Sequence, residues 1–204
     1  MFNRDSSSPW NPETPVDVSP KEYEKQVLRW LQQGTDSLQD FQASHLERLS
    51  GPGGEYEFDV VAEFTLFGGV SVVVLVECKH HKNPIKREAV MVLDTKLREV
   101  GAHKGMMFST SGFQKGALKY ATAHGIATIT FVDGKSTYET KDYGQKHEPS
   151  PWVKTFPYVG IFTDIRSGNV HCHRIDDDYL DAVAEWFSSL SEVLSGARKK
   201  GKRP

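Results

Sequence analysis

The segment that most constrains the fold is 70–79, a valine-rich run that ends in Glu77, Cys78 and Lys79. Such a run is typical of a strand buried on both faces of a sheet. Because side chains alternate along a strand, we expect Glu77 and Lys79 to lie side by side. Charged groups at the end of a buried strand are costly unless they are paired or bind a metal. The simpler interpretation is a strand that reaches solvent, so the motif needs supporting partners.

The composition is that of an ordinary globular chain. With 204 residues, 38% of them hydrophobic, the sequence can form one domain with its own core. The net charge of -2 disfavours a surface coated in positive charge but allows a local basic patch. Two cysteines, Cys78 and Cys172, indicate a reducing compartment without a disulfide framework. The stretch 1–20 is too polar for a signal peptide and no apolar run could cross a bilayer, so we expect a cytoplasmic protein with no membrane partner.

Apolar spacing and turn residues divide the chain into a core and flanking segments. Ser19, Pro20 and Glu22 form a helix start with a capping box, and Gly34 ends that helix. The remaining boundaries follow from polar composition and breaker residues. We expect a disordered lead at 1–18, a core at 19–133, a linker at 134–151, a hairpin-plus-helix appendage at 152–196 and a basic tail at 197–204.

Within the core, an antiparallel hairpin is expected to precede alternating helices and strands. The strand 56–64 follows a glycine-rich turn and pairs with 70–79, whereas 38–50 is ambiguous between a short strand and an edge element. Next come a helix at 86–100 closed by Gly101, a strand at 105–109, a helix at 113–124 and a strand at 126–132. This alternation implies parallel pairing with right-handed crossovers. The predicted class is α/β, a mixed sheet flanked by helices, and the appendage is a hairpin of 156–163 and 170–175 followed by a helix at 178–195.

The opening hairpin is expected to bring two carboxylates together. Asp59 on its first strand can lie level with Glu77 on its second. Two carboxylates there repel each other unless a divalent cation lies between them, and hard oxygen ligands suit Mg²⁺ or Mn²⁺. The backbone carbonyl of Cys78 is a third candidate ligand. The sequence therefore predicts a metal site of Asp59, Glu77 and the Cys78 carbonyl oxygen.

Two further charged residues fit the same site. Lys79, held close to the metal, can orient or deprotonate a water for in-line attack on a phosphodiester and stabilise the extra negative charge. Glu24 lies beside the apolar stripe of the first helix rather than on its wet face. If that helix packs across the hairpin, Glu24 becomes a water-mediated ligand or orients Lys79.

These residues, in this order, resemble the PD-(D/E)xK nuclease superfamily and within it the Mrr-like restriction endonuclease group. The resemblance rests on Tyr23-Glu24 in a helix, then Asp59, then Val76-Glu77-Cys78-Lys79 at the end of a strand. It covers residues 19–132 and implies a restriction-endonuclease-like fold with metal-dependent DNA cleavage. No separate DNA-reading domain is visible, and 152–204 has no recognised counterpart, so the target sequence stays open.

The resemblance also implies a supporting catalytic role for Gln114. The group follows its E-C-K strand with a helix, a strand, a helix of small residues and another strand, and Gln114 falls at the start of the second helix. Its Q-x-x-x-Y pattern is matched only loosely, because Tyr120 lies six positions after Gln114.

A basic strip follows the E-C-K motif directly. Its members are His80, His81, Lys82, Lys86 and Arg87. Each residue taken singly fits a solvated loop or helix start. As a cluster beside a phosphodiester-cleaving site, the strip is equally a DNA phosphate-binding surface.

Two other patterns receive ordinary structural interpretations. His171-Cys172-His173 resembles a metal cluster, but alternation puts its histidines on one strand face and its cysteine on the other, as in any strand. The stretch 109–112 lacks the framework of a nucleophile elbow or P-loop, so it predicts a strand-to-helix turn capped by Ser111.

The function predicted from these patterns is a Mg²⁺-dependent DNA endonuclease, with Mn²⁺ as the other candidate metal and a restriction or defence role. A double-strand cut requires two sites, which favours a homodimer. The alternative is a catalytically inactive nucleic-acid-binding or scaffold module that retains the nuclease fold. Metal-dependent stabilisation would discriminate between the two.

Overall fold

A single mixed sheet organises the residues described by this computed structural model, which are 18–33, 38–66, 69–133 and 158–175. The elements are α1 (Pro20–Gln33), β1 (Gln39–Gly51), β2 (Gly54–Leu66), β3 (Val70–Lys79), α2 (Arg87–Val100), β4 (Lys104–Ser109), α3 (Lys115–Ala123), β5 (Ala127–Asp133), β6 (Tyr158–Arg166) and β7 (Asn169–Ile175). The strands lie in sequence order from β1 to β7. Pairing is parallel between β3, β4 and β5 and antiparallel elsewhere. The predicted α/β class with an opening antiparallel hairpin is confirmed.

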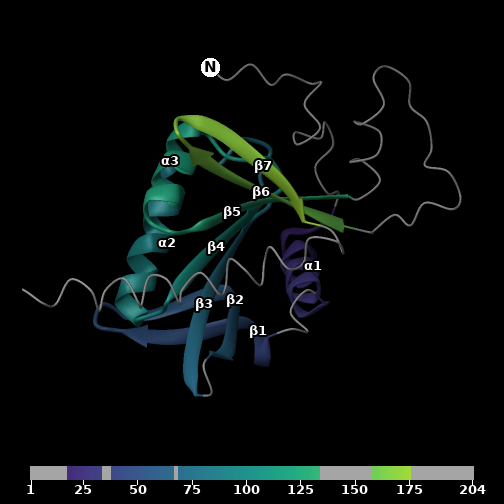
Figure 1. The fold of residues 1–204 in the computed structure, drawn as a ribbon. Helices are drawn as coiled ribbons and strands as arrows, with labels where there is room; N and C mark the ends of the chain where they lie inside the picture. Colours follow the sequence, from purple (N-terminus) through teal and green to yellow (C-terminus); the bar gives the residue numbers. More distant parts are fainter. Residues whose placement is uncertain (1–17, 34–37, 67–68, 134–157, 176–204) are drawn as a thin grey trace, which may run out of the picture.

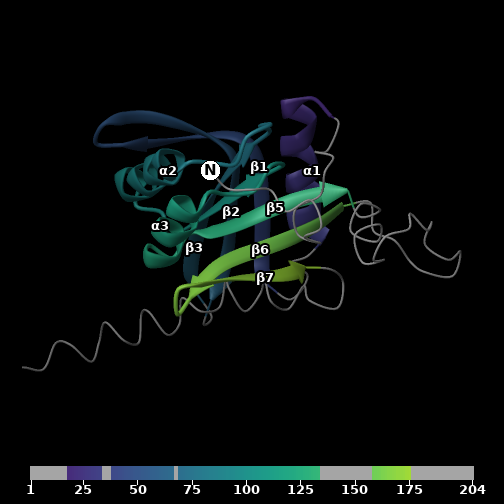
Figure 2. The ribbon, with the colours of Figure 1, turned by 90° about the horizontal axis from the view of Figure 1, so that it is seen from above.

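Helices cover both faces of this sheet, with α1 on one side and α2 and α3 on the other (Figures 1 and 2). The α1 side buries one apolar cluster, which includes Tyr23, Val27 and Phe131. The α2 and α3 side buries a second cluster, which includes Leu75 and Met107. β3 contributes to both clusters and is therefore buried on both faces of the sheet, as its valine-rich run predicted.

The helix boundaries follow from local chemistry. At the start of α1, the Glu22 backbone N–H donates a hydrogen bond to Ser19 Oγ at 3.2 Å, which confirms the predicted N-cap. At the end of α2, Gly101 adopts φ 69, and its N–H satisfies the carbonyls of Leu97 and Arg98. This left-handed cap confirms the predicted stop, since residues with a Cβ rarely adopt that conformation.

The structure clarifies two regions that the sequence described only coarsely. The ambiguous 38–50 region is a full edge strand, β1, paired along its length with β2. The hairpin predicted in the C-terminal appendage forms as β6 and β7, and it extends the core sheet because Thr130 of β5 pairs with Ile161 of β6. Outside the described residues lie the first 17 residues of the predicted lead at 1–18, Gly34, the linker at 134–151, the helix at 178–195 and the basic tail. No helix among those described is long and apolar enough to cross a membrane.

Candidate active site

The strands β2 and β3 separate where the predicted site begins. The backbone pairing of the two strands ends at Val60 and Val76. Next to Val60, the Asp59 carboxylate takes the place of a backbone hydrogen-bond acceptor. Asp59 Oδ2 accepts a hydrogen bond from the Cys78 N–H at 2.6 Å. On the other side of β2, the neighbouring strand β1 is irregular at the same level. Leu46 of β1 lies between two residues that pair with β2, and its backbone adopts φ 54. The hairpin therefore brings Asp59 to the end of β3 through a local irregularity in the sheet.

The second carboxylate, Glu77, is paired with two lysines. Lys79 Nζ lies 2.6 Å from Glu77 Oε1, which confirms that the two side chains share one face of β3. Lys96 of α2 places its Nζ 3.3 Å from Glu77 Oε2. The Lys96 ammonium also lies 5.3 Å from the centre of the Phe58 ring. Glu77 therefore has an ammonium group on each of its oxygens.

Glu24 reaches the site from α1, which packs across the hairpin as expected. Its Oε2 lies 2.9 Å from Nε2 of His45, a residue of β1, and both side chains are largely buried. The negative charge of Glu24 acts on Asp59 and raises its pKa. The structure thus brings Glu24, Asp59, Glu77 and Lys79 into one electrostatic neighbourhood.

The protonation of Asp59 reflects this neighbourhood. Burial is the largest cause that raises its pKa, to about 6, and the charges of Glu77 and Glu24 raise it further. The hydrogen bond from the Cys78 N–H and the charge of Lys79 oppose the shift but do not cancel it. At Asp59, burial and the neighbouring carboxylates therefore outweigh the charge of Lys79, and a bound cation would favour the ionised form.

The thiol of Cys78 is a poor candidate ligand. Burial is the largest cause that raises its pKa, and the charges of Asp59, Glu24 and Glu77 add to the effect. A metal binds the thiolate rather than the thiol, so this environment disfavours coordination through sulfur. The main-chain carbonyl oxygen of Cys78 carries no such penalty, which is consistent with the predicted ligand.

Gln114 lies at the same end of the sheet but is not joined to the carboxylates. The Thr110 N–H donates to the Lys79 carbonyl at 3.2 Å, so the segment leading to α3 starts beside the end of β3. Gln114 occupies the N-cap position of α3 and is exposed, and its backbone N–H donates to Ile85. Among the described residues, no hydrogen bond connects the Gln114 side chain to Asp59 or Glu77.

The predicted basic strip is divided between packing and surface. The ring of His80 packs edge-on against the Tyr23 ring, with centroids 5.7 Å apart. The Arg87 guanidinium lies 5.3 Å from the centre of the Tyr120 ring. Arg87 is nevertheless exposed, as are His81, Lys82 and Lys86. Four of the five members therefore lie on the surface, and His80 is the member that packs against α1.

Sequence reasoning missed His45 and Lys96. Both residues could have been singled out from the sequence, because each lies next to the apolar residues of its element and not on the opposite face. His45 continues the inward alternation of Phe41 and Ala43, and Lys96 follows Leu93 by one helical turn. The tertiary partners of these side chains are not encoded in that local pattern.

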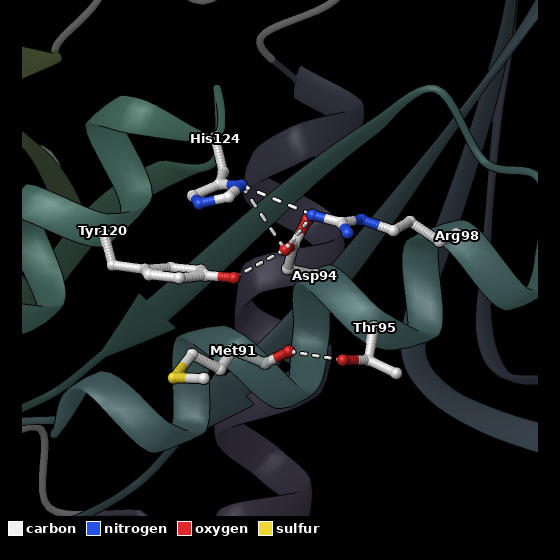
Figure 3. A network of polar contacts seen from close by, with 6 residues as sticks. All are labelled: Met91, Asp94, Thr95, Arg98, Tyr120 and His124. Atoms are coloured by element: carbon white, nitrogen blue, oxygen red, sulfur yellow. Dashed lines mark hydrogen bonds and ion pairs between the residues drawn. The ribbon is translucent and has the colours of Figure 1, made fainter.

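A polar network joins α2 to α3 (Figure 3). Asp94 Oδ2 accepts hydrogen bonds from the Tyr120 hydroxyl at 2.7 Å and from Arg98 at 2.6 Å. His124 Nδ1 lies 3.5 Å from the same oxygen, and its ring stacks on Tyr120 at a centroid distance of 4.0 Å. Tyr120, the aromatic of the loosely matched Q-x-x-x-Y pattern, therefore serves here to join two helices.

The donor set fits a hard divalent cation only if it uses main-chain oxygen. Within the described ranges, no three histidine, cysteine, aspartate or glutamate side chains gather closely enough to hold a metal ion by themselves. The expected set needs only two carboxylates, Asp59 and Glu77, together with the Cys78 carbonyl. The pKa of Asp59 is raised mainly by burial, so a nearby cation would favour its ionised form, whereas Glu77 already has an ammonium group on each oxygen.

Comparison with known proteins gives one family and one structural neighbour. No curated protein matches the chain. A crystal structure titled "Protein of Unknown Function AF1548" matches with a TM-score of 0.45 and 24% sequence identity, over 54% of this chain and 57% of that chain. The present chain thus spans little more than half the length of that neighbour.

The family comparison covers the elements that build the site. The model described as "Restriction endonuclease", Mrr_cat, matches residues 17–139, which is more than half of the 204 residues and includes every element from α1 to β5. The description of this family, restriction endonuclease, names a class of nuclease. The chain belongs to the Mrr_cat restriction endonuclease family.

Proposed function

We propose that this protein is a metal-dependent endonuclease that hydrolyses phosphodiester bonds in DNA. The observation that carries the proposal is the presence of two carboxylates, beside a lysine, where the pairing of β2 with β3 ends. Asp59 accepts the Cys78 N–H, and Glu77 holds Lys79 at 2.6 Å. These positions match the motif that defines the resemblance to restriction endonucleases.

Asp59, Glu77 and the carbonyl oxygen of Cys78 are the residues that would hold Mg²⁺, or Mn²⁺ in its place. A hard ion with oxygen ligands retains open positions for water and phosphate. When bound there, the ion would neutralise charge on the phosphate and lower the pKa of a bound water. Asp59 binds such an ion in its ionised form, so metal affinity should fall as the pH drops through about 6.

Lys79 is the residue we assign to the attacking water. Its ammonium is held on Glu77 and is therefore fixed beside the proposed metal ligands. From that position it orients the water for in-line attack and stabilises the negative charge that develops on the phosphate. Glu24 assists as a water-mediated ligand or by orienting Lys79, and Gln114 is assigned a supporting role at the same end of the sheet.

The DNA backbone is assigned to the basic strip His80, His81, Lys82, Lys86 and Arg87. Exposed cations beside the catalytic end of the sheet can contact phosphates without reading sequence. A homodimer would supply two sites for a double-strand cut, and the family's description supports a restriction or defence role as part of this proposal.

Cleavage of plasmid DNA in the presence of Mg²⁺ tests the proposal. The wild-type protein should nick or linearise the plasmid, and EDTA should stop the reaction. Asp59→Ala and Lys79→Ala should abolish cleavage, whereas Lys119→Ala, which changes an exposed lysine on α3, should cleave normally. An inert wild type, or undiminished cleavage by Asp59→Ala and Lys79→Ala, would refute the nuclease function.

One observation favours a second candidate, an inactive nucleic-acid-binding module. Both oxygens of Glu77 are already paired with lysines, an arrangement that needs no metal. Such a module would bind DNA but would not be stabilised by Mg²⁺ or Mn²⁺, whereas a catalytic site would be. Thermal unfolding with and without each metal therefore separates the two candidates.

A further inference from the structure

Lys96 is a second lysine at the site, contributed by α2 rather than by the E-C-K strand. Its ammonium lies 3.3 Å from Glu77 Oε2, on the oxygen that Lys79 leaves free. It also lies 5.3 Å from the centre of the Phe58 ring, which favours a cation over its face. The side chain remains 23% exposed, so its ammonium is held in place but is still accessible from solvent.

The two lysines at Glu77 carry no surplus positive charge until a cation binds, because Asp59 and Glu24 also lie near the site. A divalent ion held by Asp59 and Glu77 would compete with both ammonium groups for the same oxygens and leave them with too few anionic partners. An excess cation of this kind is stabilised when another anion approaches, and DNA phosphate is such an anion.

The position of α2 does not depend on the Lys96 ion pair. Asp94, on the opposite side of the helix, already joins α2 to α3 through Tyr120 and Arg98 (Figure 3). Partly exposed ion pairs contribute little to stability. A purely structural purpose therefore leaves the second ammonium at Glu77 unexplained.

We propose that Lys96 binds the DNA backbone, with its ammonium contacting a non-bridging phosphate oxygen next to the cleaved bond. Glu77 and Phe58 hold the ammonium in position before DNA arrives. Once Glu77 is committed to a metal ion, the phosphate becomes the anionic partner of Lys96. The inference rests on the proposed nuclease function and assigns a substrate contact that lies outside the E-C-K motif and the basic strip.

DNA binding without cleavage tests this assignment. The full-length wild type, Lys96→Met and Lys119→Met are titrated with a labelled DNA duplex at several salt concentrations, with Ca²⁺ as the oxygen-binding divalent cation and under conditions where no cleavage product forms. Methionine keeps an apolar stem over Phe58 but removes the charge. Lys96→Met should raise the Kd about fivefold to tenfold and reduce the slope of log K against log salt by about 0.9, the value for one lost phosphate contact. Lys119→Met should change neither quantity.

A second readout separates a substrate contact from a structural one. Without DNA, Lys96→Met should bind Mg²⁺ at least as tightly as the wild type, because a repelling charge beside Glu77 has been removed. A structural role predicts the reverse, namely weaker Mg²⁺ binding together with a lower Tm. Wild-type Kd and salt slope in Lys96→Met would overturn the assignment while leaving the nuclease intact. A wild type that binds no DNA would overturn the nuclease function itself, and this inference with it.

Discussion

Two aspartates of this protein show how differently a fold can treat a carboxylate. Asp94 on α2 is 7% exposed, and its Oδ2 accepts hydrogen bonds from the Tyr120 hydroxyl and the Arg98 guanidinium. Asp59 on β2 is also partly buried, but its hydrogen bond comes from one backbone group, the N–H of Cys78. Asp94 is surrounded by donors, whereas Asp59 faces other carboxylates.

The difference separates a structural carboxylate from a functional one. Donors around Asp94 stabilise its charge and join two helices, so the group contributes to folding. The charges of Glu77 and Glu24 act against Asp59, and its pKa rises to about 6. Such an environment costs stability and is retained where a ligand of opposite charge compensates for it.

The largest expected effect distinguishes the two aspartates by activity. Asp59→Asn should reduce plasmid cleavage by about 10³-fold, because a neutral amide cannot supply the charge that a metal ion needs. Asp94→Asn should leave cleavage per folded molecule within a few-fold of wild type. Initial rates in Mg²⁺, corrected for the folded fraction, measure both. Equal losses in the two variants would remove the distinction.

A smaller effect concerns stability and reverses the order of the two positions. Asp94→Ala removes the acceptor shared by Tyr120 and Arg98 and should lower the free energy of unfolding by about 2–3 kcal/mol. Tyr120→Phe, which deletes one donor, should cost about 1 kcal/mol. Urea denaturation of each variant provides the values. An Asp94→Ala protein as stable as wild type would mean that the network does not hold α2.

The smallest effect is a gain in stability that depends on pH. Because the pKa of Asp59 is raised in the folded protein, its ionised form opposes folding, and the penalty develops as the pH rises from about 4 to about 6. At pH 8, the free energy of unfolding of Asp59→Asn should therefore exceed that of the wild type by about 1 kcal/mol, after allowance for the partial exposure of the side chain. At pH 3, where the carboxyl is protonated in both states, this gain should be absent. Urea denaturation at the two pH values measures it, and a variant less stable than wild type at pH 8 would show that Asp59 supports the fold.

Elements with regular patterns could be predicted from the sequence. The capped start of α1 at Ser19, the strand that ends in Glu77 and Lys79, and the helix that stops at Gly101 all form as expected. In each case a local rule and the tertiary structure agree, since the apolar residues fall on the face that the fold buries.

The strand β1 could not be assigned because its backbone is irregular. The apolar residues Phe41, Ala43, Leu46 and Leu49 do not keep a period of two. Burial alternates along this part of β1 without a break, but Leu46 adopts φ 54 and falls on the exposed side of that alternation, where it is 40% exposed. A residue forced into this conformation cannot be recognised from spacing.

The partners of the site residues were beyond sequence reasoning for a different reason. Charged residues beside an apolar stripe can be singled out, as Glu24 was, but their partners depend on how helices pack against the sheet. His45 meets Glu24 only because α1 crosses β1, and Lys96 meets Glu77 only because α2 covers β3.

Binding of a divalent cation by Asp59 and Glu77 together is tested most directly by measuring Tm with and without Mn²⁺ at pH 7.5. The wild type should be stabilised, since an ion that binds only the folded state raises stability with its concentration. Asp59→Asn and Glu77→Gln should each lose that stabilisation. Asp94→Asn should retain it, although its Tm without Mn²⁺ is lower than that of the wild type. A wild type indifferent to Mn²⁺, or equal stabilisation in all four proteins, would contradict a metal site at the end of β3.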